Sequence, residues 1–241
     1  MPDHPSVPPG DLLYATGDIH GRADLLIELL DRIEHDAASE DADRRRLIFL
    51  GDYIDRGPDS RRVIEILIAR CSAPFEARFL KGNHEALLLD FLADTGRLRA
   101  WRMNGGDATM RSYGVDVAGL EQDDAPPEHW RAAFQDALPQ SHAAFFERLA
   151  LQASVGDYHF VHAGVLPGVP LDAQHEHDLL WIRDEFLNYP GAFGKVVVHG
   201  HTPCTLPDQH VNRIGIDTGA VFTGRLTALK LRGSSQSFLQ T

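Results

Sequence analysis

The sequence predicts an α/β fold with a sheet that is at least partly parallel. Up to about residue 94, three short apolar runs alternate with helical patterns, and each run ends in a polar cluster that contains glycine. The order β-α-β-α-β-α is typical of parallel strands joined by crossover helices. Because functional loops in such folds gather at the carboxyl ends of the strands, we expect the polar clusters to lie together.

The first strand is predicted from Leu12, in "LLYATGDIHG", and the helix after it in "ADLLIELLDRIEHDAA", where leucines recur on one face. The second strand is predicted from Arg46, in "RLIFLGDYIDRG", before the helical pattern "SRRVIEILIARC". The third is predicted from Phe75, in "FEARFLKGNHE", before the helical pattern "EALLLDFLAD".

The second half contains short strand-like runs with little helix between most of them, so we expect more sheet there than crossover units. The runs are "LALQASV", "YHFVHAGV", "KVVVHGHT", "RIGIDTG" and "RLTALKL". Residues 94–146 depart from this spacing, which predicts a partly helical cap over the site. We therefore expect a single domain, residues 1–241, with a cap-like insertion at about 94–146. The final segment "RGSSQSFLQT" is expected to fray at its end.

Composition and charge exclude several classes of protein. The 241 residues carry a formal net charge of -12, which opposes attraction to nucleic acid or to an anionic membrane, so we expect neither partner. The two cysteines, Cys71 and Cys204, form no Cys-x-x-Cys pair and are expected to be free thiols in a reducing compartment. Because no signal-peptide order or long apolar stretch occurs, the chain is expected to be soluble and cytoplasmic.

Five polar clusters follow apolar runs and together supply carboxylate, imidazole and amide donors. They are Asp18 and His20 in "GDIHG", Asp52, Asp55 and Arg56 in "GDYIDRG", Asn83 and His84 in "GNHE", His162 in "VHAG", and His201 in "HGHT". This mixture of oxygen and nitrogen donors suits Mn, Fe or Zn better than Ca or a metal that prefers thiolate. The simplest use of so many donors is a site for two metal ions.

A carboxylate has two oxygens, so one Asp can bridge two cations held about 3.5–4 Å apart. Asp52, in the middle cluster, is the natural candidate for that bridge. Two cations that share a water lower its pKa enough to give hydroxide near neutral pH, and they neutralise a bound phosphate. The planar guanidinium of Arg56 fits two phosphate oxygens.

In this order, "GDIHG", "GDYIDRG", "GNHE", "HAG" and "GHT" resemble the motifs of the calcineurin-like metallophosphoesterases. The resemblance is strongest to the branch with Ser/Thr phosphatases, the phage lambda phosphatase and symmetrical diadenosine tetraphosphatases. It covers the chain from about Tyr14 to Leu231 and is weakest in the insertion. It implies two packed mixed β-sheets flanked by helices.

The resemblance also implies roles for individual residues. One metal would be held by Asp18, His20 and the bridging Asp52, and the other by Asp52, Asn83, His162 and His201. His84 resembles the general acid of the family, Asp55 its carboxylate partner, and Arg56 the phosphate-binding arginine, with Arg183 in "LLWIRDEF" as the second. Two divalent metal ions are expected. Mn is the preferred candidate, and Fe and Zn are the alternatives. Trp101, Asn104, Gly105 and Gly106 match a segment of some bacterial members, with no role assigned.

Several histidines invite a second interpretation. His199 and His201 point to the same face of a strand, and we expect His201 to be the ligand and His199 to orient its neighbours. His175 and His177 lie in a polar, acidic stretch and are expected on a solvated face.

The expected function is hydrolysis of phosphomonoesters, as a Ser/Thr-type protein phosphatase, by a metal-bridging hydroxide with His84 as general acid. The alternatives are a symmetrical dinucleoside polyphosphate hydrolase, for which Arg99, Arg102 and Arg111 could form a cationic wall, and a catalytically inactive scaffold. A zinc peptidase is excluded because position 88, where a His-Glu-x-x-His motif needs its second histidine, is Leu88. The oligomeric state stays open.

Overall fold

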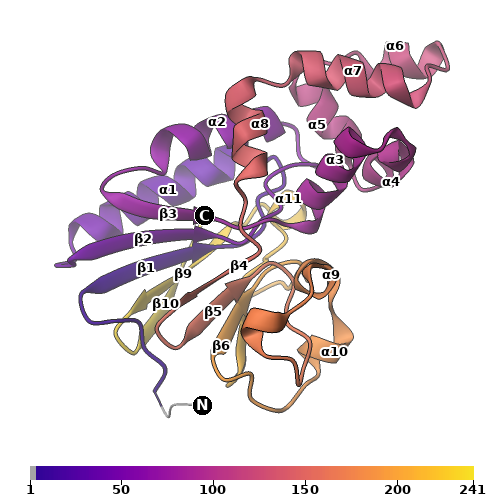
Figure 1. Ribbon diagram of the computed structural model, residues 1–241. Helices are drawn as coiled ribbons and strands as arrows, with labels where there is room; N and C mark the ends of the chain where they lie inside the picture. The colour runs from indigo at the N-terminus through magenta and orange to yellow at the C-terminus, as the bar shows by residue number, and fades with distance from the viewer. Residues whose placement is uncertain (1–3) are drawn as a thin grey trace.

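Two five-stranded β-sheets form the centre of the computed structural model, which describes residues 4–241 (Figure 1). The first sheet has the order β10-β9-β1-β2-β3 and the second β4-β5-β6-β8-β7. The strands of the first are β1 (Asp11–Thr16), β2 (Arg44–Phe49), β3 (Phe75–Phe79), β9 (Thr227–Arg232) and β10 (Ser235–Gln240). Those of the second are β4 (Gln152–Val155), β5 (Tyr158–Val161), β6 (Val196–His199), β7 (Asp208–Gln209) and β8 (Arg213–Gly215).

Both sheets are mixed. Strands β1, β2 and β3 run parallel, while β9 and β10 are antiparallel to their neighbours. In the second sheet β5, β6 and β8 run parallel, with the antiparallel strands β4 and β7 at the edges. The predicted α/β fold is confirmed, and so are the two packed mixed sheets flanked by helices that the resemblance implied.

Strand β1 shows why the sheets pack as layers. Successive side chains of a strand point to opposite faces. Leu12 and Tyr14 belong to the core beneath the helices, whereas Leu13 and Ala15 belong to a second core with side chains of β5, β6 and β8. All four side chains are fully buried. Strand β1 is therefore buried on both faces, which explains its continuous apolar run.

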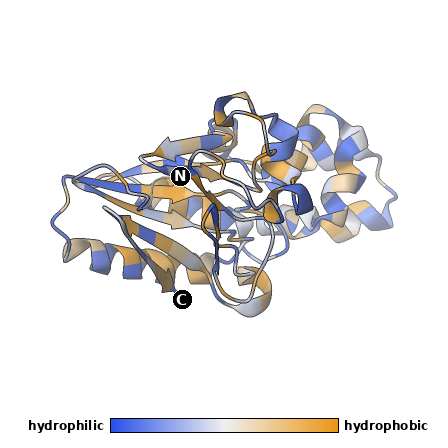
Figure 2. Cartoon of the chain, turned by 90° about the horizontal axis from the view of Figure 1, so that it is seen from below, coloured by the Kyte–Doolittle hydropathy of each residue, from blue (hydrophilic) through white to orange (hydrophobic). Residues whose placement is uncertain are grey.

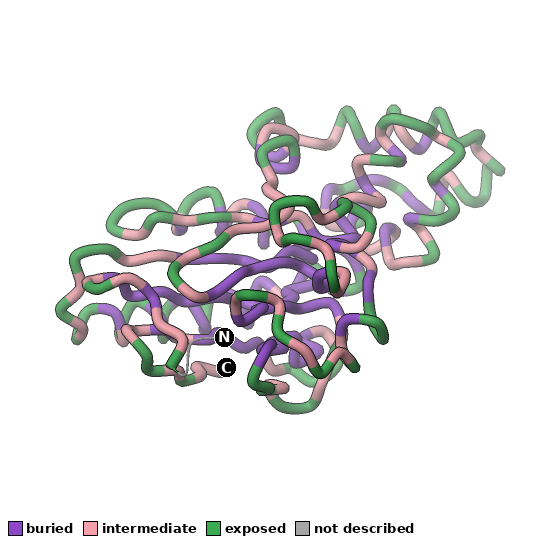
Figure 3. Tube along the Cα trace, turned by 60° about the horizontal axis from the view of Figure 1, so that its bottom comes forward, coloured by how far each residue is buried: buried purple, intermediate pink, exposed green. Residues whose placement is uncertain are grey.

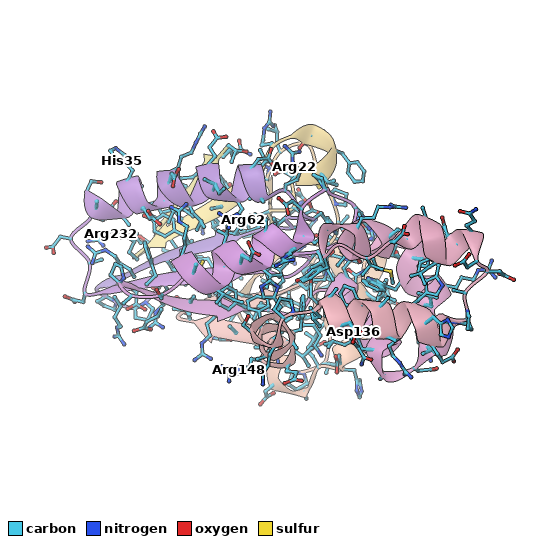
Figure 4. All side chains as sticks on the ribbon, turned by 90° about the horizontal axis from the view of Figure 1, so that it is seen from above. Arg22, His35, Arg62, Asp136, Arg148 and Arg232 are labelled. Atoms are coloured by element: carbon cyan, nitrogen blue, oxygen red, sulfur yellow. The ribbon has the colours of Figure 1, made fainter. Side chains whose placement is uncertain are left out.

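Helices α1 (Ala23–Ala38) and α2 (Ser60–Arg70) cover the outer face of the first sheet (Figure 1). Leu26, Leu29 and Ile33 of α1 are fully buried, which is the apolar face that the leucine spacing predicted. Apolar residues concentrate in the strands and on the helix faces that pack against them (Figure 2). The strands are also among the buried segments (Figure 3). Figure 4 shows the polar side chains His35 and Arg62 on α1 and α2.

The outer face of the second sheet is covered by α9 (Glu176–Trp181) and α10 (Asp184–Leu187), which follow the short 3-10 helix η2 (Leu171–Ala173). Leu179 and Phe186 of these helices pack with Val161 and Val197 of the sheet. The expectation of little helix in the second half is therefore correct between most strands, but not between β5 and β6.

Residues 95–147 are helical and extend to one side of the sheets in Figure 1. The elements are η1 (Thr95–Arg97), α4 (Leu98–Met103), α5 (Gly106–Ser112), α6 (Val117–Gln122), α7 (Pro127–Ala137) and α8 (Gln140–Glu147). Phe134 of α7 packs edge-on against both Trp101 and Tyr113, which gives the segment an aromatic core. That this segment acts as a cap on a single domain stays a prediction.

The expectation of a frayed final segment is wrong. Residues Ser235–Gln240 form β10, which pairs with β9 along its whole length, and Gly233 supplies the positive φ of 54° in the turn between them. Cys71 and Cys204 are free thiols, as expected. Among residues 4–241, no helix has the length and apolar character needed to cross a membrane. The cytoplasmic location stays a prediction.

Candidate metal centre

The residues expected to bind metal follow the carboxyl ends of strands from both sheets. Those after β1 and β2 come from the first sheet, those after β5 and β6 from the second, and Asn83 begins helix α3 (Asn83–Ala93) after β3. All are buried: Asp18, His20, Asp52, Asn83, His162 and His201. The fold therefore brings clusters that are up to 183 positions apart in the chain into contact, as the hydrogen bond between Asp18 and His201 shows.

Three of these residues have left-handed backbone conformations. The φ angles are 46° for His20, 50° for Asp52 and 63° for His201. Residues other than glycine adopt such angles rarely, and the strain persists only where surrounding contacts enforce it. Such strain collects at functional sites, so the backbone marks these loops independently of their side chains.

Asp52 is shared by two groups of possible ligand atoms. In the first, atoms of His20, Asp52 and His84 lie within 4.8 Å of one another, and in the second the same holds for Asp52, His162 and His201. His20 Nε2 lies 3.5 Å from Asp52 Oδ2, and His162 Nε2 lies 3.4 Å from Asp52 Oδ1. The two carboxylate oxygens thus face different groups.

Asn83 joins the second group through its amide oxygen. Asn83 Oδ1 lies 2.9 Å from His162 Nε2 and 3.0 Å from His201 Nδ1. The other nitrogen of His162, Nδ1, is 2.9 Å from the carbonyl oxygen of Leu50. A carbonyl accepts only, so Nδ1 carries the proton and Nε2 offers its lone pair to the centre of the group.

Asp18 reaches the site by a different contact. Its carboxylate accepts the backbone N–H of His201 at 3.0 Å. Burial and the nearby carboxylates of Asp217 and Asp52 raise the pKa of Asp18 well above its ordinary value. Burying several carboxylates side by side is unfavourable without a compensating positive charge.

The donor set fits divalent cations. Among the candidate ligands, His201 Nε2 is a buried nitrogen without a hydrogen-bond partner among the described residues. Burial lowers the pKa of His20 to about 3 and that of His201 to about 2, so both imidazoles are neutral and can offer a lone pair. Neutral imidazole, carboxylate and amide oxygen are the ligands that Mn, Fe or Zn accept.

His84 and Asp55 form a buried pair beside the first group. His84 Nδ1 lies 2.7 Å from Asp55 Oδ2, and His84 Nε2 lies 3.8 Å from Asp52 Oδ2. Burial lowers the pKa of His84, but the carboxylates of Asp52 and Asp55 outweigh it and raise that pKa above its ordinary value. Because Nδ1 is paired with Asp55 and the pKa is raised, His84 can carry a second proton on Nε2.

Arg56 and Arg183 are exposed and lie at the edge of the site. Arg56 Nη1 is 3.0 Å from His20 Nε2, and Arg183 Nη2 donates to the carbonyl oxygen of His201 at 3.4 Å. The guanidinium group of Arg56 therefore lies beside the first group of possible ligands, and that of Arg183 lies beside the second.

His199 lies in neither group. Its Nδ1 is 3.1 Å from the carbonyl oxygen of Gly200, and its Nε2 is 3.4 Å from Arg213 Nη1. The edge of the ring packs on Phe186. Both nitrogens are thus directed away from the candidate ligands, which distinguishes His199 from His201.

Two buried carboxylates at the site are not among the residues predicted from the sequence. Glu85 accepts the backbone N–H groups of Asp52 at 2.9 Å, Tyr53 at 2.8 Å and Gly82 at 3.0 Å. Burial and the charge of Asp52 raise the pKa of Glu85 to about 8, while these donors favour its ionised form. A Glu at the third position of a helix that follows glycine is a capping signal that could have indicated this role.

Asp217 is the second missed residue. It lies in "GIDTG" after β8, the same pattern of apolar run, carboxylate and glycine that singled out the other clusters. Its carboxylate accepts the backbone N–H of Gly219 at 2.8 Å. Burial raises the pKa of Asp217 to about 6, beside Asp18 and Asp52.

The segment around Trp101 reaches the site. The carbonyl oxygen of Gly105 accepts the backbone N–H of Arg56 at 3.3 Å, and Trp101 contacts Asp55. Gly105 has a φ of 105°, and a Cβ there would lie 2.8 Å from the backbone nitrogen of Arg56. Glycine is therefore required at 105 for this close approach. The side-chain amide of Asn104 donates to the carbonyl oxygen of Ala100, within the same segment.

Comparison with known proteins identifies the family. The profile of the calcineurin-like phosphoesterases matches residues 12–226. An asymmetrical bis(5'-nucleosyl)-tetraphosphatase, PrpE, of Bacillus thuringiensis is 29% identical over 89% of this chain and 88% of its own length. Serine/threonine-protein phosphatase 1 of Salmonella typhimurium is 28% identical over 91% of this chain and 92% of its own.

Solved structures agree on the fold. A crystal structure provisionally named as a diadenosine tetraphosphatase matches with a TM-score of 0.65 at 21% identity, covering 98% of both chains. The cold-active protein-tyrosine phosphatase of a Shewanella species matches with a TM-score of 0.55 at 17% identity, over 98% of this chain and 83% of that one. Together, the family profile and the fold show that this chain belongs to the calcineurin-like phosphoesterases and is a metal-dependent phosphoric ester hydrolase.

Proposed function

We propose that this chain hydrolyses phosphomonoesters with two divalent cations, Mn in the first place, and that it acts as a Ser/Thr-type protein phosphatase. The observation that carries the proposal is the position of Asp52, whose two carboxylate oxygens face two separate groups of buried donors. A carboxylate between two such groups is the arrangement that a two-metal site requires.

In this proposal each cation has its own ligand set and shares Asp52. One set comprises Asp18, His20 and Asp52, and the other comprises Asp52, Asn83, His162 and His201. Bound cations would supply an activated water near neutral pH and neutralise charge on the phosphate. The buried, neutral imidazoles support this assignment, because they add donors without adding negative charge.

The remaining side chains bind and orient the phosphoester. Arg56 and Arg183 would hold the phosphate oxygens, because planar guanidinium groups match them in geometry and charge. His84 would donate the proton at Nε2 to the departing oxygen, while Asp55 fixes the opposite nitrogen at 2.7 Å. A general acid in this position contributes roughly 10²–10⁴ in rate.

The choice of substrate rests on the helical segment and on charge. Arg102, one of the arginines considered for a polyphosphate-binding wall, pairs with Asp107 at 2.7 Å and also with Glu121. Arg111 lies 3.9 Å from Asp107. These acidic partners offset the charge of Arg102 and Arg111, and the net charge of -12 adds no attraction for a chain of four phosphates. Both points support a phosphoprotein or a small phosphomonoester.

Hydrolysis of dinucleoside tetraphosphates is the second candidate. The similarity to PrpE of Bacillus thuringiensis supports it, and the name of that relative specifies asymmetrical cleavage rather than the symmetrical reaction considered from the sequence. An inactive scaffold is disfavoured, because each candidate ligand is present and buried.

One set of assays tests the proposal. The purified protein would be stripped of metal, reloaded with Mn, Fe or Zn, and offered phosphopeptides, an aryl phosphate and diadenosine tetraphosphate. We expect two metal ions per chain by elemental analysis and the highest kcat/KM on a phosphoserine or phosphothreonine peptide with Mn. If diadenosine tetraphosphate is cleaved much faster than the phosphopeptides, dinucleoside polyphosphates rather than phosphoproteins are the substrate class. A chain that binds two ions but has no phosphoesterase activity would contradict the whole proposal.

A further inference from the structure

The helical segment 95–147 sends two side chains into the interior of the site, and both contact Asp55. Trp101 of α4 donates its indole N–H, with Nε1 3.1 Å from Asp55 Oδ1 and 3.0 Å from Oδ2. Thr109 of α5 donates its hydroxyl to Oδ1 at 2.6 Å. On the other side, Oδ2 faces His84 Nδ1 at 2.7 Å. All four side chains are fully buried.

The backbone of Asp55 is held by the same segment. Its φ angle is 70°, in the left-handed region that residues other than glycine adopt in only a few per cent of cases. The backbone N–H of Asp55 donates to Thr109 Oγ1 at 2.9 Å and to Ser60 Oγ at 3.1 Å. Thr109 therefore accepts from the main chain of Asp55 and donates to its side chain.

Trp101 is itself fixed. Its ring stacks on Phe91 of α3 at a centroid distance of 5.2 Å and meets Phe134 edge-on at 5.4 Å. A Cβ at Gly106 would lie 2.6 Å from the Trp101 ring, so no side chain fits there. The indole N–H consequently has one orientation, and that orientation faces Asp55.

A buried carboxylate keeps a single orientation only when its lone pairs are satisfied. Three side chains donate to Asp55, and two of them come from the helical segment. Without those two, the carboxylate could turn about its side-chain bonds and lose its alignment with the imidazole. Breaking a fully satisfied buried network in this way costs more than any one of its hydrogen bonds.

We propose that Trp101 and Thr109 are positioning residues for proton transfer: they fix the Asp55 carboxylate so that it holds His84 Nδ1 and directs His84 Nε2 into the site. This inference rests on the proposed function, in which His84 is the general acid. It gives the helical segment a part in the chemistry, in addition to any part in substrate choice.

The experiment compares paired variants on two substrates. Thr109→Val removes the hydroxyl at nearly constant shape, and Thr109→Ser restores it. Trp101→Phe removes the indole N–H, and Trp130→Phe is its matched control, because Trp130 is a buried tryptophan of α7 whose N–H donates to the carbonyl oxygen of Ala125. Each variant would be assayed on an alkyl phosphate, a poor leaving group, and on an activated aryl phosphate, with metal content measured.

We expect Thr109→Val and Trp101→Phe to lose at least tenfold more kcat/KM on the alkyl phosphate than on the aryl phosphate, with two metal ions retained. Thr109→Ser and Trp130→Phe should keep the wild-type ratio. Equal losses on both substrates in Thr109→Val, or the same behaviour in the Ser and Val variants, would overturn the inference. The Thr109 pair decides the question by itself if Trp101→Phe fails to fold.

A readout independent of turnover uses proton NMR of the metal-free protein. The N–H of His84 at Nδ1, identified by its disappearance in His84→Asn, should be protected from exchange in the wild type and in Thr109→Ser, and lost in Thr109→Val. Retention of that signal in Thr109→Val would contradict the inference. If His84→Asn itself shows no difference between the two substrates, the general-acid role fails and the inference falls with it; if only the Trp101 and Thr109 variants show none, the inference alone fails.

Discussion

The carboxylate of Glu85 accepts the backbone N–H of Asp52 at 2.9 Å, so the first turn of α3 holds the loop that carries the shared carboxylate. Asp52 in turn accepts the backbone N–H of His84 at 3.1 Å. The two acidic residues thus hold each other's segments in place. This reciprocal contact stabilises the left-handed conformation of Asp52, whose φ angle is 50°.

The first prediction concerns Glu85→Gln. An amide at this position keeps one oxygen acceptor but presents an NH₂ group to backbone N–H donors, which leaves at least one buried donor unsatisfied. We expect a loss of stability of about 1–3 kcal/mol and weaker metal binding, although Glu85 is not a proposed ligand. Chemical denaturation and metal titration would measure both. Unchanged metal affinity would show that Glu85 does not position Asp52.

The second prediction concerns Asp52→Asn. An amide has a single oxygen and no charge, so it cannot bridge two cations as a carboxylate does. We expect both metal ions to be lost together and turnover to fall with them. Asn83→Asp is the matched comparison, because Asn83 contacts only the second group, and it should affect one ion more than the other. Elemental analysis of the dialysed variants measures how many ions each retains. Retention of one tightly bound ion in Asp52→Asn would show that Asp52 does not bridge the two cations.

Much of this site could be predicted from the sequence because its residues lie in short motifs directly after apolar runs. Parallel strands bring their carboxyl ends together, so Asp18, Asp52 and Asn83 had to meet once the three strands were recognised. Glu85 and Asp217 were missed for a different reason. Each lies in a pattern that marks a helix cap or a polar cluster after an apolar run, but the backbone N–H groups that each carboxylate accepts are set by the folded loops.

Two further features could not be predicted from local pattern. Strand β10 lies at the sheet edge and is only partly buried, so its sequence "SQSFLQ" carries a weak apolar signal; its pairing with β9 defines it. The role of Trp101 depends on a contact with Asp55, 46 positions away. Long-range contacts of this kind leave no trace in local periodicity.

The third prediction concerns His84→Asn. A poor leaving group needs a proton as its bond to phosphorus breaks, whereas an activated aryl leaving group does not. We expect the variant to lose roughly 10²-fold or more on an alkyl phosphate and far less on an activated aryl phosphate, with Asp55→Asn showing a milder form. Measuring kcat/KM across leaving groups tests this. A parallel decrease for every leaving group would argue against proton donation by His84.

The fourth prediction concerns stability in acid. Burial, with a smaller contribution from Lys195, lowers the pKa of His159 to about 4. The unfolded chain binds a proton at this residue below pH 6.5, while the folded chain does not until about pH 4. The contribution of His159 to the free energy of unfolding is therefore fully present above pH 6.5. It decreases as the pH falls from 6.5 to 4, by at most about 3 kcal/mol.

Denaturation of wild type and His159→Gln at several pH values isolates this effect, because every other residue is the same in both proteins. The variant should show a shallower decrease in the free energy of unfolding between pH 6.5 and 4. Identical slopes for His159→Gln and wild type would mean that His159 is protonated in the folded protein.

The last prediction concerns Arg102, because its role separates the two substrate candidates. Its guanidinium pairs with Asp107 and Glu121 and lies 4.1 Å above the ring of Trp130. These contacts link α4, α5, α6 and α7, so we expect Arg102→Gln to lower the melting temperature by several degrees, from a loss of about 1–3 kcal/mol. The ratio of activities on diadenosine tetraphosphate and on an aryl phosphate should not change.

Arg111→Gln, whose pair with Asp107 is longer at 3.9 Å, should have little effect on either the melting temperature or this ratio. If Arg102→Gln instead abolishes cleavage of the tetraphosphate and spares the aryl phosphate at unchanged stability, then Arg102 binds phosphate and the dinucleotide is the substrate.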